Sequence, residues 1–423
     1  MDSIEVGPER QPPRLYCPAN FSPTRTLAKS QRDLSDGLVY LAHTVIMRRV
    51  LDPRHKHRDG FVPLASQHIR RILGARHWPR IKQAGVDCGL VECDGSYRAG
   101  HRSLGYRLCE PYASAPWELR EIHNPRLSRR IDEWRTQRRQ RCWDEIRAGK
   151  RRVSPEVCEH LYHHLQRIQI DEDIPETLTN ESAVAVDMIR RGQWRFDVDD
   201  YGRVHTNITN LRRLLRARLT VDGMRLVNCD IANSQPLFIG MRLQPGGKQA
   251  GRGEGGRKGQ GSGQGSTICC ALFGSLGKLS TDIERFIILC GGGKLYRFVE
   301  SRLGDEMHYA TLKRRVLATF YDRDSHRNVF YGILDKEFPM VMRGIRAVKR
   351  LDYRHLAHLA QRTESEFIFV RVVSRLLRER PGLFVTTIHD SVMTTAGDEE
   401  TVKGVMLDEF KKLNIPATVR IER

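Results

Sequence analysis

Two aspartates, each placed where an apolar stretch ends, are the residues best suited to chemistry in this sequence. Asp230 follows the apolar start of LVNCDIANSQPLFI, residues 226–239, and Asp390 that of LFVTTIHDSVMTT, residues 383–395. Each apolar run predicts a buried strand, and a carboxylate at its end is costly to desolvate unless a cation meets it. Because Lys- and Arg-rich helical stretches separate the two segments, we expect a pair of divalent metal ions that act on phosphates.

The residues around each aspartate predict how it is held. LVNC predicts a strand before Asp230, and Asn233 or Ser234 can then cap a helix. Asp390 lies near the tip of a predicted hairpin whose second strand is SVMTT, followed by an amphipathic helix and a last strand, ATVRI. This order predicts a small antiparallel sheet with a helix on one face, on which the two aspartates converge.

Four segments in order resemble the palm and fingers of polymerase I-type (A-family) DNA polymerases. They are GRVHTNITNLRRLLR at 202–216, DIANSQP at 230–236, the Lys-bearing helical stretch YATLKRRVLATFY, and TIHDS at 387–391. No single segment is specific, but their order is. The resemblance covers about residues 200–395 and is closest to short, exonuclease-free polymerase-like proteins of phages and mobile elements, whose N-terminal region also resembles a winged helix.

The resemblance implies a role for each matching residue. Asp230 and Asp390 resemble the metal-binding carboxylates, and the backbone carbonyl of Ile231 would be a third ligand of two Mg²⁺ ions, with Mn²⁺ as a substitute. Lys313 resembles the lysine that neutralises the incoming triphosphate, and His389 the histidine near the primer end. The other implied contacts are Gln235 and Tyr321 at the nucleotide, and Arg203, His205, Arg212, Arg216 and Gln361 along the template–primer. We expect the last two arginines of the 202–216 segment to share one helix face.

Several positions depart from the family pattern. Gln235 stands where the family has a Glu that excludes ribose 2′-hydroxyls, so the choice between deoxyribonucleotides and ribonucleotides stays open. Tyr309 stands where an Arg is expected, Asp322 replaces a Gly, and Ser391 replaces a Glu. Triphosphate binding would then depend on one of three other cations: Arg314, Arg315 or Lys294.

Each assignment also has a structural alternative. Asp230 and Asp390 could be a helix cap and a hairpin-turn residue that hold no metal. A turn histidine such as His389 is more often a hydrogen-bonding residue than a catalyst, and Lys313 could be plain surface charge. The geometry of these residues has to decide.

Composition favours a nucleic-acid partner. The 423 residues include 71 Lys and Arg against 51 Asp and Glu, a formal net charge of +20. Such a surplus favours polyanions, and no stretch approaches the ~18 uninterrupted apolar residues of a membrane helix. The ten cysteines contain no C-x-x-C pair, which favours reduced thiols. We expect a cytoplasmic protein without membrane contact that binds DNA and nucleoside triphosphates, with replication accessory proteins as further candidate partners.

The N-terminal part predicts a separate DNA-binding region. Residues 1–30 are Pro-rich and predict a flexible arm. Residues 31–112 contain three helical patterns and then two strand-like runs joined by the basic turn DGSYRAGHRSL, which is the order of a winged helix. The helix near 79–88 would be the reading element, with Arg98 and Arg102 on the wing. The alternative is a small helical domain with a solvated basic loop.

Residues 113–195 predict a basic helical linker or thumb-like region. Within it, residues 126–152 hold 11 Lys and Arg against four acids, and Trp134 and Trp143 interrupt the run at near-helical spacing. A charge run is usually a solvated helix face, but so dense a surplus of one sign favours contact with a phosphate backbone. The candidate contacts are Arg135, Arg138 and Arg139.

Residues 196–423 form the predicted polymerase palm and fingers. They include a Gly-rich insert at 246–266 that predicts a flexible loop, and GGGK at 291–294, which lacks the spacing of a P-loop. The expected fold class is therefore α+β, with a winged-helix-like domain, the basic helical linker, and a palm of small antiparallel sheet with helical fingers.

Two functions of different classes stay open at this point. The first is template-directed nucleotidyl transfer, by a DNA polymerase of a phage or mobile element with two Mg²⁺ ions. The second is a DNA-binding replication-initiation or regulatory protein whose palm is vestigial. A third, synthesis or priming from ribonucleotides, is left open by Gln235.

Overall fold

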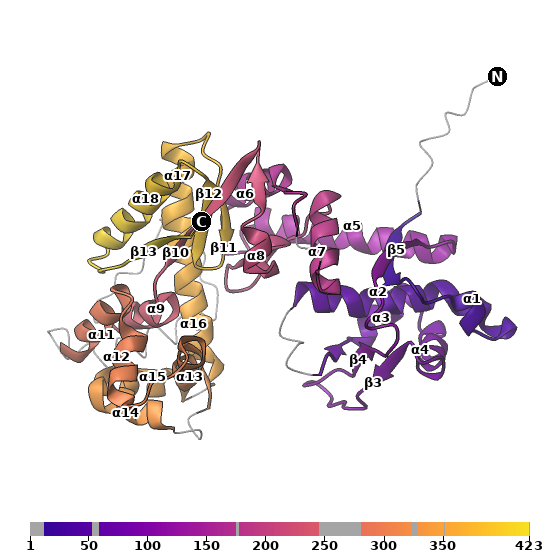
Figure 1. Ribbon diagram of the computed structural model, residues 1–423, viewed down its shortest axis with the longest axis horizontal. Helices are drawn as coiled ribbons and strands as arrows, with labels where there is room; N and C mark the ends of the chain where they lie inside the picture. The colour runs from indigo at the N-terminus through magenta and orange to yellow at the C-terminus, as the bar shows by residue number, and fades with distance from the viewer. Residues whose placement is uncertain are drawn as a thin grey trace. The chain divides into compact units, whose positions relative to one another are not determined.

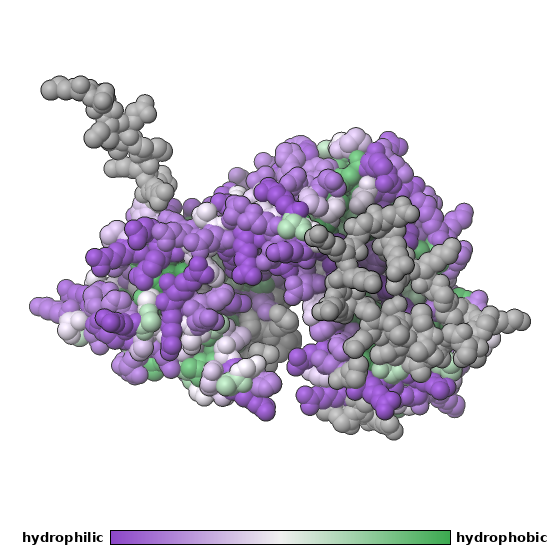
Figure 2. Space-filling view, turned by 180° about the vertical axis from the view of Figure 1, so that it is seen from behind, coloured by the Kyte–Doolittle hydropathy of each residue, from purple (hydrophilic) through white to green (hydrophobic). Residues whose placement is uncertain are grey.

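The computed structural model describes most of the chain. The described ranges are 12–52, 59–174, 177–244, 281–323, 328–350 and 352–422; the predicted Gly-rich loop lies outside them. Within these ranges the protein is a mixed α and β structure whose sheets are all small and antiparallel (Figure 1). The α+β class is therefore correct at this level. Most described residues on the face drawn in Figure 2 are hydrophilic.

The chain forms two compact units. Of the described residues, the first unit contains those of 12–144, 170–194 and 210–215, and the second contains those of 145–169, 195–209 and 216–422. These units do not follow the expected boundaries, because part of the predicted linker, residues 170–194, packs with the N-terminal residues.

The first unit begins with a strand pair where a flexible arm was predicted. β1 (Arg14–Pro18) pairs antiparallel with β5 (Trp117–Glu121), and Leu15 is fully buried. The flexible-arm prediction is therefore wrong for the residues of β1, because their partner strand lies far along the chain and no local pattern reveals it. Two short helical segments follow, α1 (Pro23–Thr26) and the 3-10 helix η1 (Lys29–Leu34).

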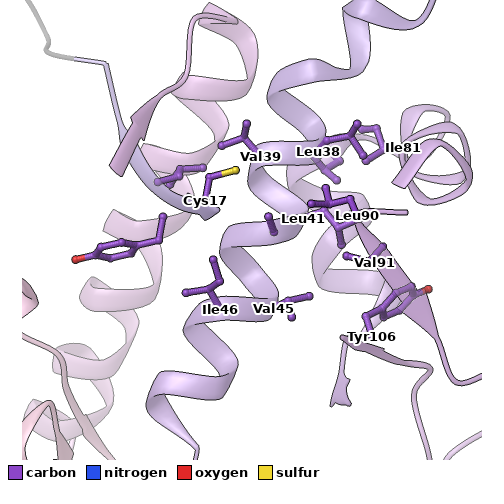
Figure 3. Packing of buried hydrophobic residues seen from close by; sticks show 14 of the residues in the cluster. Cys17, Leu38, Val39, Leu41, Val45, Ile46, Ile81, Leu90, Val91 and Tyr106 are labelled. Carbon is purple, nitrogen blue, oxygen red and sulfur yellow. The ribbon is translucent and has the colours of Figure 1, made fainter. Parts of the chain in front are cut away.

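Three helices and a three-stranded sheet form the centre of this unit. They are α2 (Ser35–Leu51), α3 (Ser66–Leu73) and α4 (His77–Asp87), with β2 (Val62–Pro63), β3 (Val91–Cys93) and β4 (Gly105–Leu108) in the sheet order β2–β4–β3. Leu38, Leu41 and Val45 of α2 lie in the shared apolar core (Figure 3). A side chain at Gly85 of α4 would come within 3.2 Å of both leucines, so the glycine permits this close helix contact.

Two further helices extend the unit. α5 (Pro125–Arg147) buries Leu127 and Ile131 in the same core, while most of its arginines stay exposed. α7 (Asn180–Arg190) is tied to the N-terminal residues by the ion pair between Glu181 and Arg49, 2.6 Å.

The second unit is organised by a six-stranded sheet. The strands are β6 (Gln169–Ile170), β9 (Leu219–Val221), β10 (Met224–Ile231), β11 (Thr386–Ile388), β12 (Ser391–Thr395) and β13 (Val419–Glu422). Their order is β11–β12–β10–β9–β6, and β13 pairs with β10. The predicted order of two strands, a helix and a strand is present as β11, β12, α18 (Glu399–Lys412) and β13.

The alternation of side chains along β10 decides which face carries the chemistry. Cys229 and Ile231 are buried, whereas Asn228 and Asp230 are only half-buried, as the two-residue period of a strand requires. The buried side faces α18, where the Cys229 thiol lies 3.5 Å from the carbonyl of Glu399. Asp230 therefore projects from the opposite face of the sheet.

Helices and a hairpin complete the second unit. The short helix α8 (Arg213–Arg216) lies at the boundary, with residues 213–215 in the first unit. The elements of the second unit are α6 (Pro155–Arg167), the hairpin β7 (Phe196–Val198) and β8 (Val204–Thr206), the 3-10 helix η3 (Ile208–Asn210), α9 (Ser234–Leu243), α11 (Thr281–Gly291), α12 (Leu295–Leu303), α13 (Tyr309–Tyr321), α14 (Val329–Glu337), α15 (Pro339–Lys349), α16 (Arg354–Ser365), the π-helix η4 (Glu366–Val373) and α17 (Ser374–Glu379). The last three run on as one long helix (Figure 1), and π segments inside helices occur frequently at functional sites. Among the described residues, no helix combines the length and the apolarity that crossing a bilayer requires.

Candidate active site

The two aspartates lie at neighbouring positions of the sheet. Asp230 on β10 is paired directly with Ser391 on β12, the residue that follows Asp390. Since adjacent strands are about 4.8 Å apart, both carboxylates sit at one end of the β10–β12 pair. The Ser234 hydroxyl, at the start of α9, donates a hydrogen bond to Asp390 Oδ2. The structure therefore places the two aspartates close together.

This carboxylate pair is electrostatically unfavourable without a cation. Burial, then Asp390 and then Glu422 raise the pKa of Asp230 to about 7, against the opposing effects of Lys313 and Arg420. Lys313, on the exposed side of α13, lies close enough for its charge to act on the Asp230 carboxylate. A half-buried acid pair with nearby cations is the environment in which a divalent ion or a proton is expected to bind.

His389 and Asp390 form the two-residue turn that joins β11 to β12, because Ile388 and Ser391 are paired. The turn holds His389 in the left-handed backbone region, φ 53°. Its buried Nδ1 has no hydrogen-bond partner among the described residues. Burial, and then the charges of Arg203 and His205, lower the pKa of His389 to about 4, so the ring is neutral at pH 7.

His205 on β8 stands beside this ring and is held by a residue that sequence reasoning missed. The two imidazole centroids are 6.1 Å apart at 72°. Asp199 Oδ2 lies 3.0 Å from His205 Nε2, and Asp199 Oδ1 accepts the backbone N–H groups of Tyr201 and Arg203. Although burial raises the pKa of Asp199, these hydrogen bonds hold it below its ordinary value. The turn sequence DDYG was the available signal for such a side chain.

A buried glutamate, also missed from the sequence, organises the next layer. Glu364 on α16 is 1% exposed and accepts two hydrogen bonds of 2.9 Å from Arg203. It also accepts the side-chain N–H of Gln235, whose Oε1 accepts the Tyr321 hydroxyl at 2.6 Å. Burial raises the pKa of Glu364 to about 8, and the Arg203 guanidinium opposes that rise. The chain Arg203–Glu364–Gln235–Tyr321 joins four elements of the second unit.

The remaining predicted residues are more dispersed. Arg314 is exposed next to Lys313, and Gln361 lies on α16 one turn before Glu364. The shared helix face predicted for Arg212 and Arg216 is wrong, because α8 spans only Arg213–Arg216 and β9 begins three residues later. Leu214, in the single turn of α8, is 78% exposed.

The predicted nucleic-acid contacts of the N-terminal part lie in the first unit. The backbones of Arg98 and Arg102 form an isolated antiparallel β-bridge in the loop between β3 and β4. The Arg102 guanidinium forms an ion pair with Asp94 at 2.8 Å. On α5, the arginines proposed for the phosphate backbone are exposed: Arg135, Arg138 and Arg139.

The oxygen atoms around Asp230 and Asp390 are the candidate ligands for a metal ion. Among the described residues, no group of three or more His, Cys, Asp and Glu side chains is arranged to hold one. The donors that the structure brings together are the carboxylates of Asp230 and Asp390, and the resemblance adds the backbone carbonyl of Ile231, the last residue of β10. All are hard oxygen ligands, and Mg²⁺ commonly uses one or two protein carboxylates together with substrate phosphates and water. The set therefore fits magnesium bound jointly with a phosphate substrate.

Comparison with known proteins found only weak similarity to solved structures. No protein-family model and no curated protein matches the chain. Among solved structures, it is similar to the POL domain of Pol1 from M. smegmatis, in complex with DNA primer-template and dNTP. The match has 12% sequence identity and a TM-score of 0.33, and covers 54% of this chain and 46% of that chain, so the protein spans less than half of that structure. A similarity of this size carries no argument about function, and we rely on the residues themselves.

Proposed function

We propose that the protein is a template-directed nucleotidyltransferase, specifically a DNA polymerase of a phage or mobile element. The observation that carries the proposal is the placement of Asp230 beside the turn that bears Asp390, with Lys313 acting on the same carboxylate. Phosphoryl transfer depends mainly on positioning and on neutralising charge, which paired carboxylates and a lysine supply when metal ions are bound.

The same residues would hold the ions. Asp230, Asp390 and the Ile231 carbonyl would bind two Mg²⁺ ions, or Mn²⁺, together with the phosphates of the substrate. When bound, such ions stabilise the attacking and leaving oxygens of an in-line displacement. The raised pKa of Asp230 supports this assignment, since an acid pair that repels its own charge gains most from a cation.

The surrounding side chains would position nucleotide and primer. Lys313 and Arg314 would neutralise the triphosphate. The Tyr321 ring, fixed by the hydrogen bond from its hydroxyl to Gln235, would form a rigid wall beside the nucleotide. His389, neutral and with one unpaired ring nitrogen, would lie near the primer end. The guanidinium of Arg203 is largely used by Glu364, so we assign it a positioning role beside its predicted contact with the template–primer.

We further propose that the first unit binds duplex DNA as a winged helix. The element order α2, β2, α3, α4, β3, β4 is the order of that fold, with α4 as the reading helix and the β3–β4 turn as the wing. The exposed arginines of α5 would contact phosphates next to it.

Primer extension tests the catalytic assignment. With the full chain, a primed template and Mg²⁺, Asp230→Ala and Asp390→Ala are expected to abolish extension while duplex affinity stays within a few-fold of wild type. Glu400→Ala, at an exposed acid of α18, serves as the matched control and should extend normally. Extension at near wild-type rate by either aspartate variant would refute the site.

Two other outcomes are distinguishable in the same assay. Incorporation from ribonucleotides alone would identify an RNA-synthesising or priming enzyme, for which the neutral amide of Gln235 is the relevant feature. Tight, metal-independent binding to one duplex sequence, without incorporation by wild type, would identify a DNA-binding initiation or regulatory protein with a vestigial palm. Ser391, in place of a third acid beside the pair, is the observation that favours this reading.

A further inference from the structure

Strand β10, which carries Asp230, lies between β12 and β13, and β13 carries the cation Arg420. β13 pairs with β10 in a register that sets Arg420 directly against Asp230 and Val419 against Ile231. Side chains of directly opposed residues project from the same face of an antiparallel sheet. Arg420 therefore stands beside Asp230 on the open face, and its charge acts on that carboxylate.

A glycine turn after α11 is built around this arginine. A side chain at Gly293, φ 70°, would lie 2.9 Å from Arg420 Nη2 and 3.2 Å from Cβ of Ala232. A side chain at Gly291 would collide with the backbone carbonyl of Pro416, just before β13. The backbone of GGGK, residues 291–294, therefore packs directly against the start of β13 and the Arg420 guanidinium. Only glycine permits so close an approach.

Arg420 is exposed and, within the part of the chain that the structure describes, makes no ion pair or hydrogen bond through its guanidinium. Arg203, on the other side of the site, contrasts with it because Glu364 holds its guanidinium from two sides. A guanidinium that stands beside a carboxylate without hydrogen-bonding to it has its donor fork available for an anionic ligand, and that fork matches the geometry of phosphate oxygens.

The two sides of β10 therefore differ in chemistry. Asp390 and His389 lie on the β12 side, whereas Arg420 and the glycine turn lie on the β13 side. We propose that Arg420, with the turn at residues 291–294, forms a binding site for the polyphosphate chain of a nucleoside triphosphate. This inference rests on the proposed function, and it adds Arg420 to the cations already considered for the triphosphate, of which Lys294 lies in the same turn.

Isothermal titration calorimetry on the full chain in Mg²⁺ buffer tests the site directly. The titrants are inorganic tripolyphosphate, a deoxynucleoside triphosphate and the corresponding nucleoside, each with and without primed template. Arg420→Ala is expected to raise Kd for both polyphosphates about tenfold, because the variant loses a charge-assisted hydrogen bond to the phosphate oxygens. Arg420→Lys should lie between, because lysine keeps the charge but loses the fork. Binding of the nucleoside should not change.

Arg378→Ala is the matched control, because Arg378 is an exposed arginine on α17 in the same unit and contributes nothing to the site. It should bind every titrant as wild type does, and circular dichroism should show all variants folded. The inference is overturned if wild type binds no tripolyphosphate, or if Arg420→Ala binds it within twofold of wild type.

The outcome for the proposed function is separate. Loss of polyphosphate affinity in Arg420→Ala, together with no primer extension by wild type, would keep the polyphosphate site and refute the polymerase. Extension by wild type with an unchanged nucleotide KM in Arg420→Ala would keep the polymerase and refute this site.

Discussion

The arginines of α5 and the arginine at the candidate active site belong to the same residue type but have different physical situations. Arg135, Arg138 and Arg139 are exposed along a helix of the first unit. Arg203, in the second unit, lies against a fully buried glutamate through two hydrogen bonds of 2.9 Å. Exposed cations act through a field that salt screens, whereas a buried pair fixes geometry and resists screening. Arginine is therefore suited to long-range attraction of a polyanion in the first unit and to positioning other residues in the second.

The largest expected effect breaks the buried pair. Arg203→Ala leaves Glu364 without its counter-charge, so at pH 9, where the carboxyl is ionised, the free energy of unfolding should fall by about 3–5 kcal/mol. At pH 6 the carboxyl can take up a proton and the loss should be smaller. Chemical denaturation followed by circular dichroism measures both. The double variant Arg203→Ala with Glu364→Gln should recover part of the loss, and equal stability of the single and double variants at pH 9 would contradict the pairing.

The next effect concerns the exposed cations. Replacing Arg135, Arg138 and Arg139 by alanine should weaken duplex binding and reduce the slope of log affinity against log salt by about 0.9 for each phosphate that is no longer neutralised. Fluorescence anisotropy at several salt concentrations measures the slope, with Arg190→Ala on α7 as the exposed control. An unchanged slope in the triple variant would show that α5 is only a solvated face.

A third effect is the pH dependence of stability that the buried Glu364 carboxyl causes. The pKa of Glu364 is about 8 in the folded protein, against an ordinary value of 4.5, so the folded state holds the proton more tightly. The stabilisation is therefore complete below about pH 4.5 and is lost as pH rises toward 8, by up to about 1.4 kcal/mol per pH unit. Glu364→Gln should flatten this decline in thermal scans from pH 5 to 9, and an identical pH profile for variant and wild type would contradict it.

The smallest effect lies at the edge of the network. Tyr321→Phe removes the hydroxyl that Gln235 accepts, at a cost of about 1 kcal/mol. Because the proposed wall beside the nucleotide then loses its anchor, KM for nucleotides should rise several-fold with little change in duplex affinity. Steady-state kinetics with deoxyribonucleotides and ribonucleotides would measure it, and unchanged KM values for both would separate Tyr321 from the nucleotide site.

Local patterns were enough to place several elements. Apolar and polar residues alternate in VNCDI, which indicates a strand with Asp230 on its polar face, so β10 was predictable. The HDS turn between apolar runs indicates a hairpin, so the β11–β12 turn was predictable as well. The helix face expected to carry Arg212 and Arg216 did not form, because α8 is a single turn and β9, which pairs with β10, begins at Leu219. A tertiary pairing therefore overrode a local helical pattern.

The sequence by itself determined the element types, the surplus of positive charge and the two carboxylates at strand ends, because period, capping and composition are local properties. Only the tertiary structure decided which charges meet. Glu364 and Arg420 are ordinary charged residues in the sequence, and their significance comes from α16 burying one against Arg203 and β13 setting the other opposite Asp230. Such pairings join residues far apart in the chain, and their energies depend on desolvation, which no local pattern records.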